Sequence, residues 1–265
     1  MRFDVITLFP ELLTPFTSAG INRRAFETGA VELKLWQLRD YAEGTYRRVD
    51  DRPFGGGPGM VMSADPLEKC LLAIRQDRLA KNPSEVPVPV VLFSPIGQTL
   101  THSGVESWSQ SDGAILICGR YEGLDQRFIE TYVNVQISLG DFVLSGGEIA
   151  AIALLDAVAR LQPGVLNDEG SHQMDSFNPA IDGLLDCGHY TRPETWHGQS
   201  VPPILMSGHH ADIAKWRRQQ SLSLTHQHRP DLLVAARAKG QLSVKDEHFL
   251  AQLPDNDAGK AQCGN

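Results

Sequence analysis

Three glycine-rich stretches combine backbone freedom with polar side chains, a combination that suits close binding of a ligand. They are VDDRPFGGGPGM (49–60), CGRYEG (118–123) and LGDFVLSGGE (139–148). The first is not a nucleotide-phosphate loop, because Gly59 is followed by Met60 rather than by Lys and Ser or Thr, and no apolar strand leads into it. CGRYEG suits an ordinary strand-to-helix turn as well as it suits a binding loop.

The third stretch leads into a long apolar helix. Ser145 and Glu148 match a capping box at its start. Capping does not explain Gly140 and Asp141, nor the doubled glycine at 146–147. A binding loop is therefore an alternative to simple capping here.

Two single residues are candidates for acid–base or electrostatic chemistry. Arg160 ends the apolar helix predicted over 148–161, where a cation also interacts favourably with the helix dipole. Asp175 lies in a polar segment, 163–183, where an aspartate more often caps a turn. The four cysteines are scattered and no histidine has zinc-ligand spacing, so we expect neither disulfides nor a structural zinc site.

Basic residues gather in one segment of an acidic chain. The formal net charge is −8, which argues against extended coating by nucleic acid. Between residues 209 and 229, one aspartate (Asp212) stands against four cations: Lys215, Arg217, Arg218 and Arg229. Such a local surplus of positive charge suits contacts with nucleic-acid phosphates.

Apolar runs alternate with a helical pattern over the first 160 residues. Strands are predicted for FDVITLF (3–9), VPVVLF (88–93), AILICG (114–119) and VNVQIS (133–138), and a helix for 66–80. This alternation is typical of an α/β domain with a mainly parallel sheet. The loops FSPIG, CGRYEGLD and LGDFVLSGGE follow three of these strands. Because open α/β sheets bind ligands at the carboxyl ends of their strands, we expect these loops to form one composite pocket.

The helix predicted over 148–161 is apolar on nearly all sides, since eleven of the thirteen residues from Ile149 to Leu161 are apolar. Such a helix is buried in a core or against a second subunit. A polar segment typical of a functional loop or linker follows, and a second, mostly helical module begins near Gly183. The tail from about residue 254 is expected to be disordered.

The first residues, MRFDVITLFPELL, match neither a signal peptide nor a membrane span, because Asp4 and Pro10 interrupt a short apolar run. We therefore expect a cytoplasmic protein with no membrane partner. A chain of 265 residues suits one large domain or two smaller ones.

Several motifs occur together along most of the chain. They are VDDRPFGGGPGM, CGRYEGLDQR, SLGDFVLSGGE, PGVL, DSF, GLLDC-x-HYTRPE, VPPILMSG and HRPDLL. In this order, from LFPE near the start to about Leu233, the sequence resembles the bacterial tRNA (guanine-N(1))-methyltransferase family. That family transfers a methyl group from S-adenosylmethionine to the guanosine at tRNA position 37, just 3′ of the anticodon. The resemblance therefore implies this activity and this cofactor.

The resemblance also implies a fold and an assembly. A SPOUT-type α/β domain with a parallel sheet and a deep trefoil knot would occupy residues 1–165. A flexible linker would follow over 166–177, and then a small, mainly helical tRNA-binding domain over 178–265. Two chains would form a homodimer with active sites shared between them. The cofactor would be held by three loops, through Leu92, Phe93, Ser94, Pro95, Gly119, Tyr121, Glu122, Gly123, Leu139, Gly140, Asp141, Phe142, Val143, Leu144, Gly146 and Gly147.

Further roles follow from the same resemblance. Asp175 would remove the proton from ring nitrogen 1 of guanine, and Arg160 would stabilise negative charge on the guanine carbonyl oxygen. Glu122 would be a supporting polar contact. Pro58 and Gly59 would lie beside the guanine, which is what the first glycine-rich loop would face. Magnesium is expected for full activity, with no recognisable site. Contacts with tRNA phosphates would come from Lys215, Arg217 and Arg218.

Four positions depart from the family pattern. Phe142 stands where tyrosine is frequent, Gly188 where proline is usual, and Gln98 where a basic residue is frequent. The segment 225–233 lacks the usual aromatic residue and extra arginine, which leaves open which C-terminal residues contact tRNA. Two alternatives remain, a SPOUT ribose methyltransferase and an RNA-binding module without catalysis.

Overall fold

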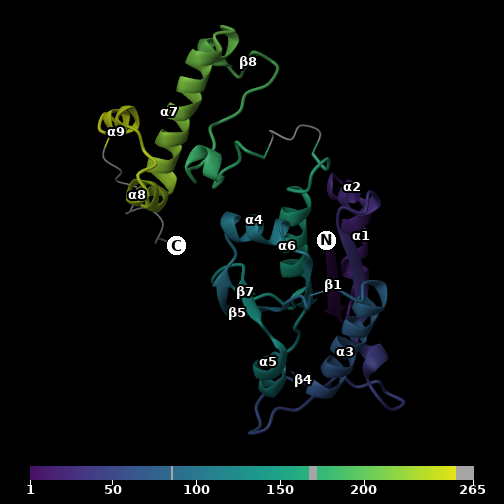
Figure 1. Ribbon diagram of the computed structural model, residues 1–265. Helices are drawn as coiled ribbons and strands as arrows, with labels where there is room; N and C mark the ends of the chain where they lie inside the picture. The colour runs from purple at the N-terminus through teal and green to yellow at the C-terminus, as the bar shows by residue number, and fades with distance from the viewer. Residues whose placement is uncertain (85, 167–171, 255–265) are drawn as a thin grey trace. The chain divides into compact units, whose positions relative to one another are not determined.

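The computed structural model of the chain describes residues 1–84, 86–166 and 172–254. It divides into two compact units, Met1–Asn167 and Asp168–Asn265, both drawn in Figure 1. Residues 167–171 of the predicted linker and the predicted tail beyond residue 254 lie outside the described residues.

A five-stranded, all-parallel sheet forms the centre of the first unit, in the order β2-β1-β6-β5-β7. Its strands are β1 (Arg2–Thr7), β2 (Glu32–Gln37), β5 (Val90–Thr99), β6 (Gly113–Ile117) and β7 (Val135–Ser138). The predicted parallel α/β architecture is confirmed. Strand β2 was not predicted, because its sequence ELKLWQ mixes charged and apolar residues and none of its side chains is fully buried at this edge of the sheet.

Helices cover both faces of this sheet. On one face lie α1 (Thr14–Ser18), α2 (Asn22–Glu27), α4 (His102–Ser109) and α6 (Glu148–Ala159), in a core that includes Phe3 and Val5 of β1. On the other face lie α3 (Ala64–Lys81) and α5 (Gln126–Tyr132), in a core that includes Ile6. Successive strand residues point to opposite faces, so Val5 and Ile6 serve different cores. Two short 3-10 helices follow strands of this unit, η1 (Pro10–Leu12) and η2 (Leu38–Tyr41).

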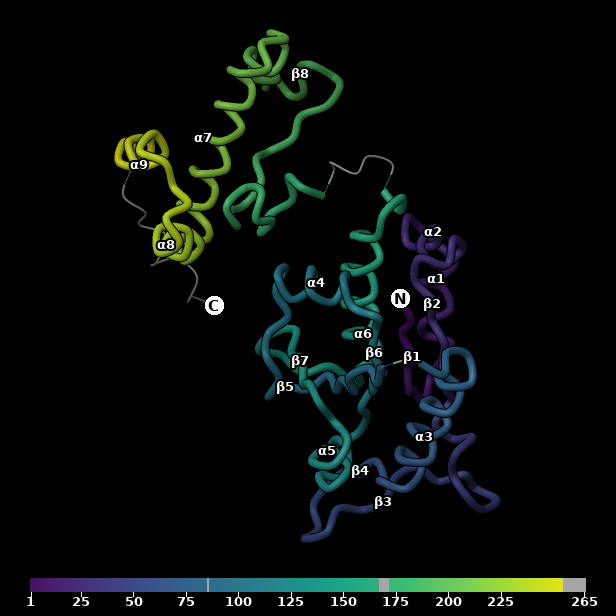
Figure 2. The backbone as a smooth tube through the Cα atoms, viewed as in Figure 1, coloured from purple at the N-terminus to yellow at the C-terminus, as the bar shows by residue number. Residues whose placement is uncertain are grey.

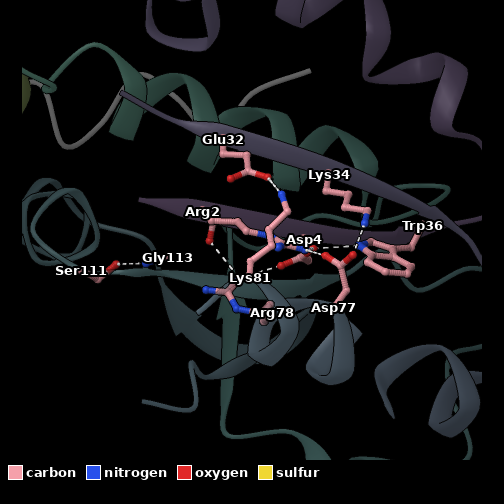
Figure 3. A network of polar contacts seen from close by, with 10 residues as sticks. All are labelled: Arg2, Asp4, Glu32, Lys34, Trp36, Asp77, Arg78, Lys81, Ser111 and Gly113. Atoms are coloured by element: carbon pink, nitrogen blue, oxygen red, sulfur yellow. Dashed lines mark hydrogen bonds and ion pairs between the residues drawn. The ribbon is translucent and has the colours of Figure 1, made fainter. Parts of the chain in front are cut away.

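A buried polar network fastens α3 to β1 and β2 (Figure 3). Asp4 is fully buried and accepts hydrogen bonds from three side chains: Arg2 (2.6 Å), Arg78 (2.6 Å) and Trp36 Nε1 (2.8 Å). Asp77 of α3 accepts further hydrogen bonds from Lys34 and Arg2, both at 2.7 Å. The Lys34 ammonium is the main cause of the lowered pKa of Asp77. Because a buried charge is tolerated only when it is paired, this network fixes the position of α3 on the sheet.

A short antiparallel hairpin, β3 (Asp50–Asp51) with β4 (Val61–Met62), lies at the end of the first unit that holds α5 (Figure 2). The loop between its strands, residues 52–60, contains all the glycines of the first glycine-rich stretch. Gly55, Gly56, Gly57 and Gly59 all have positive φ, between 77° and 112°. These values explain the glycines, since other residues rarely adopt this conformation.

The second unit contains three α-helices within its described residues, α7 (His210–His228), α8 (Pro230–Ala238) and α9 (Val244–Leu250). Its core includes Leu184, Leu222, Leu233, Ala236 and Leu250. The mostly helical module predicted from Gly183 has its α-helices after residue 209, and residues 184–202 hold a small hairpin, β8 (Thr195–Trp196) with β9 (Gln199–Ser200). The 3-10 helices η3 (Pro179–Ile181) and η4 (Pro203–Met206) flank this region. Within the described chain, no helix combines the length and apolar character needed to cross a membrane.

Candidate active site

The bulged part of β5 and the loops after β6 and β7 meet around one cavity of about 420 Å³ in the first unit. This is the carboxyl edge of the sheet, where the strand pattern predicts a composite pocket. The segment FSPIG, predicted as a loop after a strand, lies within β5, whose register with β7 shifts between Phe93 and Gln98. Every residue predicted to hold the cofactor lines the cavity except Asp141, which lies exposed on the loop between Gly140 and Phe142. Further lining residues were not singled out from the sequence, among them Ile96, Arg120, Gln136, Ser138 and Ser145.

An ion pair joins the loop after β6 to the start of α6 at the cavity wall. Arg120 Nη2 lies 2.8 Å from Glu148 Oε2 at the start of α6, and Arg120 Nη1 donates to the Ser145 carbonyl at 3.2 Å. Thr7, at the end of β1, donates to Glu148 Oε1 at 2.8 Å. Only 1% of Glu148 is exposed. These contacts tie the second and third glycine-rich stretches together.

The capping box predicted from Ser145 and Glu148 is wrong. Helix α6 begins at Glu148, its N-cap is Gly147, and no side chain caps it. Glu148 is occupied with Arg120 instead. A Cβ on Gly147 would lie 2.8 Å from Cys118 Cα, and one on Gly146 would lie 2.2 Å from Arg120 Nε. The doubled glycine is therefore required for close packing of these loops.

The first glycine-rich loop docks on the CGRYEG stretch. Glu122 N donates to the Met60 carbonyl at 3.0 Å, and Met62 N donates to the Gly123 carbonyl at 2.9 Å. A Cβ on Gly59 would lie 2.4 Å from Glu122 Oε1, so only glycine fits there without a shift. Because Glu122 lines the cavity, this loop borders the cavity. Pro58 is exposed beside Gly59.

Tyr121 joins this border to the hairpin strand β3. Its φ is 59°, an uncommon value for a residue with a side chain. Burial, and then a hydrogen bond with Asp50, raises the pKa of the Tyr121 hydroxyl. The hydroxyl is therefore a neutral donor at physiological pH, and it engages the Asp50 carboxylate.

The two residues expected to do acid–base and electrostatic work lie in different units. Arg160 is the C-cap of α6, where its backbone N donates to the Asp156 carbonyl at 3.2 Å, and its side chain is half-buried. Asp175 belongs to the second unit, in a turn where Asn178 N donates to the Asp175 carbonyl at 3.1 Å. Its side chain is half-buried.

The cations of the basic segment fall into two groups, exposed residues and one residue held in ion pairs. Lys215 and Arg217 are exposed on α7. Arg218 instead pairs with Asp182 at 2.7 Å and with Asp246 at 3.0 Å. Burial opposes this arrangement, but the hydrogen bonds from Arg218 and Ser243 lower the pKa of Asp246. Arg218 thus joins α7 to α9 and to the end of η3.

One group of potential metal ligands occurs among the described residues. Ligand atoms of Asp186, Cys187 and His189 lie within 4.8 Å of one another. His189 Nε2 and Asp186 Oδ2 are 2.9 Å apart, and Cys187 N donates to Asp186 Oδ1 at 2.6 Å, so hydrogen bonds account for the arrangement. The thiol and imidazole do not suit magnesium, which prefers oxygen ligands.

Comparison with known proteins gives consistent matches. The family described as tRNA (Guanine-1)-methyltransferase TrmD matches residues 1–235. A tRNA (guanine-N(1)-)-methyltransferase from Polaromonas sp. (strain JS666) is 70% identical over 261 residues, 97% of this chain and 100% of that protein. Proteins of the same name from Paracidovorax citrulli and Bordetella pertussis are 67% and 53% identical, each over 96% of this chain and 98% of the relative. This chain therefore belongs to the tRNA (guanine-1)-methyltransferase family.

Proposed function

We propose that the chain transfers the methyl group of S-adenosylmethionine to ring nitrogen 1 of guanosine 37 in tRNA. The observation that carries this proposal is the meeting of β5 and the loops after β6 and β7 around one cavity, in a chain that is 70% identical to a tRNA (guanine-N(1)-)-methyltransferase. A volume of about 420 Å³ is in the range of small-molecule sites.

The cavity lining fits S-adenosylmethionine. Leu92, Ile137 and Leu144 offer apolar surface for an adenine ring, and the loop backbones offer amides and carbonyls. Gly123 has a φ of 126° and open space where a Cβ would stand, so a ligand can approach its backbone. When bound, the cofactor supplies an electrophilic methyl group on a sulfonium sulfur.

The protein's own groups must remove a proton and stabilise charge. Ring nitrogen 1 of guanine carries a proton at neutral pH, and the Asp175 carboxylate accepts it, which frees the nitrogen lone pair to attack the methyl carbon. The methyl–sulfur bond breaks, and its electron pair stays on sulfur. The Arg160 guanidinium stabilises the negative charge that grows on the guanine carbonyl oxygen. Glu122, with Pro58 and Gly59 beside it, borders the guanine. No step of this scheme uses magnesium.

Exposed cations of α7 would hold the tRNA. Lys215 and Arg217 are free to meet phosphates, whereas Arg218 is engaged with two carboxylates. We therefore narrow the expected phosphate contacts to Lys215 and Arg217, and assign Arg218 to the stability of the second unit.

A second copy of the chain would complete the site. Ile149 is 58% exposed on α6, and Ile152 and Ala153 lie half-buried on the same helix face. An isologous interface would bury this face against its twin. The knot and the sharing of each site between chains come from the family resemblance. In that arrangement, the cofactor loops of one chain face Asp175 of the other.

The test is methyl transfer to tRNA carrying either G or A at position 37, followed by mass spectrometry of the nucleosides. The proposal predicts 1-methylguanosine from the G37 tRNA and no product from the A37 tRNA. A 2′-O-methylated nucleoside from both substrates would identify a ribose methyltransferase instead. Binding without transfer would indicate an RNA-binding module.

A further inference from the structure

We propose that four side chains around the β3 strand form a second RNA contact, in which aromatic rings stack on unpaired bases and arginines meet phosphates. These residues are Tyr46, Arg48, Arg52 and Phe54, and we name them the arginine–aromatic arm. The inference rests on the proposed target, a base in the anticodon loop, and names the surface that receives the nucleotides around it.

The two aromatic side chains of the arm are highly exposed and take no part in a hydrophobic core of the described residues. Phe54 is 101% exposed and Tyr46 is 86% exposed, although aromatic side chains usually contribute to a core or an interface. The segment between them is firmly attached. Val49 is fully buried, its carbonyl accepts a hydrogen bond from Ser63 N at 2.8 Å, and β3 pairs with β4. The rings are thus held out from an anchored segment.

The arm also carries cations without partners. Arg48 and Arg52 are exposed, and within the described part of the chain neither guanidinium makes a hydrogen bond or an ion pair. Three nearby acidic groups are already engaged, and the exposed Asp51 carboxylate accepts a hydrogen bond from Arg52 N at 2.8 Å. Arg47 pairs with Asp40 at 2.9 Å, Lys69 pairs with Glu43 at 2.5 Å, and Asp50 bonds the Tyr121 hydroxyl. The arm therefore presents two exposed guanidinium groups, with the exposed Asp51 carboxylate between them in sequence.

The arm is continuous with the border of the cavity. Asp50, between Arg48 and Arg52, contacts Tyr121, and the same loop reaches Gly59 against Glu122. Both Tyr121 and Glu122 line the cavity. An RNA strand that delivers one base into this cavity must place its neighbouring nucleotides close to the arm.

The chemistry of the arm favours RNA over a protein or lipid partner. Arg47, Arg48 and Arg52 separate the two rings in sequence, whereas a protein interface or a membrane would favour a continuous run of apolar residues. Alternation of aromatic rings with arginines is how proteins hold single-stranded nucleic acid, because every base offers a face for stacking. Unpaired bases of an anticodon loop are such a ligand.

Phe54→Ala tests the stacking. We expect it to raise the Kd for tRNA about 5- to 100-fold, since one base–aromatic stack accounts for a change of this size. Phe54→Trp should stay close to wild type. A 2-aminopurine next to position 37 should lose fluorescence on binding the wild type and keep it with Phe54→Ala. Leu72→Ala, an exposed apolar residue on α3, is the matched control.

Arg48→Ala with Arg52→Ala tests the phosphate contacts. The double variant should reduce the slope of log Kd against log salt by about 2. Arg23→Ala on α2 is the control for an exposed arginine outside the arm.

Two results would overturn the arm. One is a tRNA Kd for Phe54→Ala within twofold of that for Leu72→Ala. The other is a Phe54→Ala variant whose affinity for S-adenosylmethionine falls as much as its affinity for tRNA, or whose oligomeric state changes. The arm would then support the cavity or a second subunit rather than contact RNA. The wild type is assayed in parallel for methylation of G37 tRNA. If the wild type methylates this tRNA, either outcome counts against the arm and not against the proposed function.

Discussion

At the scale of residues, Glu148 holds together parts of the chain that are far apart in sequence. Its carboxylate meets Thr7 from β1 and Arg120 from the loop after β6, while its own backbone starts α6. The Arg120 guanidinium also lies over the Phe9 ring, 4.5 Å from its centroid. Such a buried pair is costly to break from one side, because the remaining charge loses its partner.

We expect Glu148→Ala to lower the free energy of unfolding of the first unit by about 3–5 kcal/mol. It should also weaken S-adenosylmethionine binding, since the loop after β6 and the loop that precedes α6 would no longer be joined through the Arg120–Glu148 ion pair. Urea denaturation and titration calorimetry measure the two effects. Glu27→Ala, which removes an exposed pair with Arg23, should cost less than about 1 kcal/mol. If Glu148→Ala lowered the free energy of unfolding no more than Glu27→Ala does, the stabilising role of the Arg120–Glu148 pair would be contradicted.

At the scale of elements, the sequence predicted what depends on runs of apolar residues. Strands β1 and β6 consist of residues buried on both faces, so their apolar runs identified them. The half-buried edge strand β2 has no such run. The sequence also could not show that Glu148 pairs with Arg120, or that Arg218 pairs with Asp246, because each partner lies more than 25 residues away. The loops after β6 and β7 could be predicted because they directly follow strands. FSPIG was wrongly predicted as a loop, because its Pro and Gly lie in a bulged continuation of β5.

The link between α7 and α9 gives the second unit a dependence on pH. Against the effect of burial, the bonds from Arg218 and Ser243 hold the pKa of Asp246 below its usual 3.8. Since the pKa is lower in the folded state, this stabilisation is complete well above pH 3.8 and is lost as the pH falls through the folded-state pKa.

Asp246→Asn should therefore lower the free energy of unfolding at pH 7, by about 1–3 kcal/mol for hydrogen bonds to a charged group. The difference from wild type should shrink towards zero as the pH falls below 3.8. Denaturant unfolding followed from pH 7 to pH 3 measures this. Asp231→Asn, which removes an exposed pair with Arg229, should have little effect. A constant difference across this pH range would rule out the ionised pair as its cause.

At the scale of the whole molecule, the proposal places the cofactor loops and Asp175 of one site on two different chains. Co-expression of a Gly119→Trp chain with an Asp175→Ala chain tests this sharing. A bulky side chain at Gly119 would fill the cavity that this residue lines. In a shared-site heterodimer, one site combines both defects and the other has intact loops and an intact base. Activity should return towards half of wild type per heterodimer, and an inactive purified heterodimer would refute the sharing.

The central claim is that Asp175 removes the proton from guanine while the cavity of the first unit holds the cofactor. The most direct measurement is the single-turnover rate of methyl transfer to G37 tRNA by Asp175→Ala, at saturating S-adenosylmethionine. The account predicts a rate about 10²- to 10⁴-fold below wild type, the usual contribution of a general base. The Kd for S-adenosylmethionine should be unchanged, because no predicted cofactor contact involves Asp175. A near-normal single-turnover rate would contradict the account.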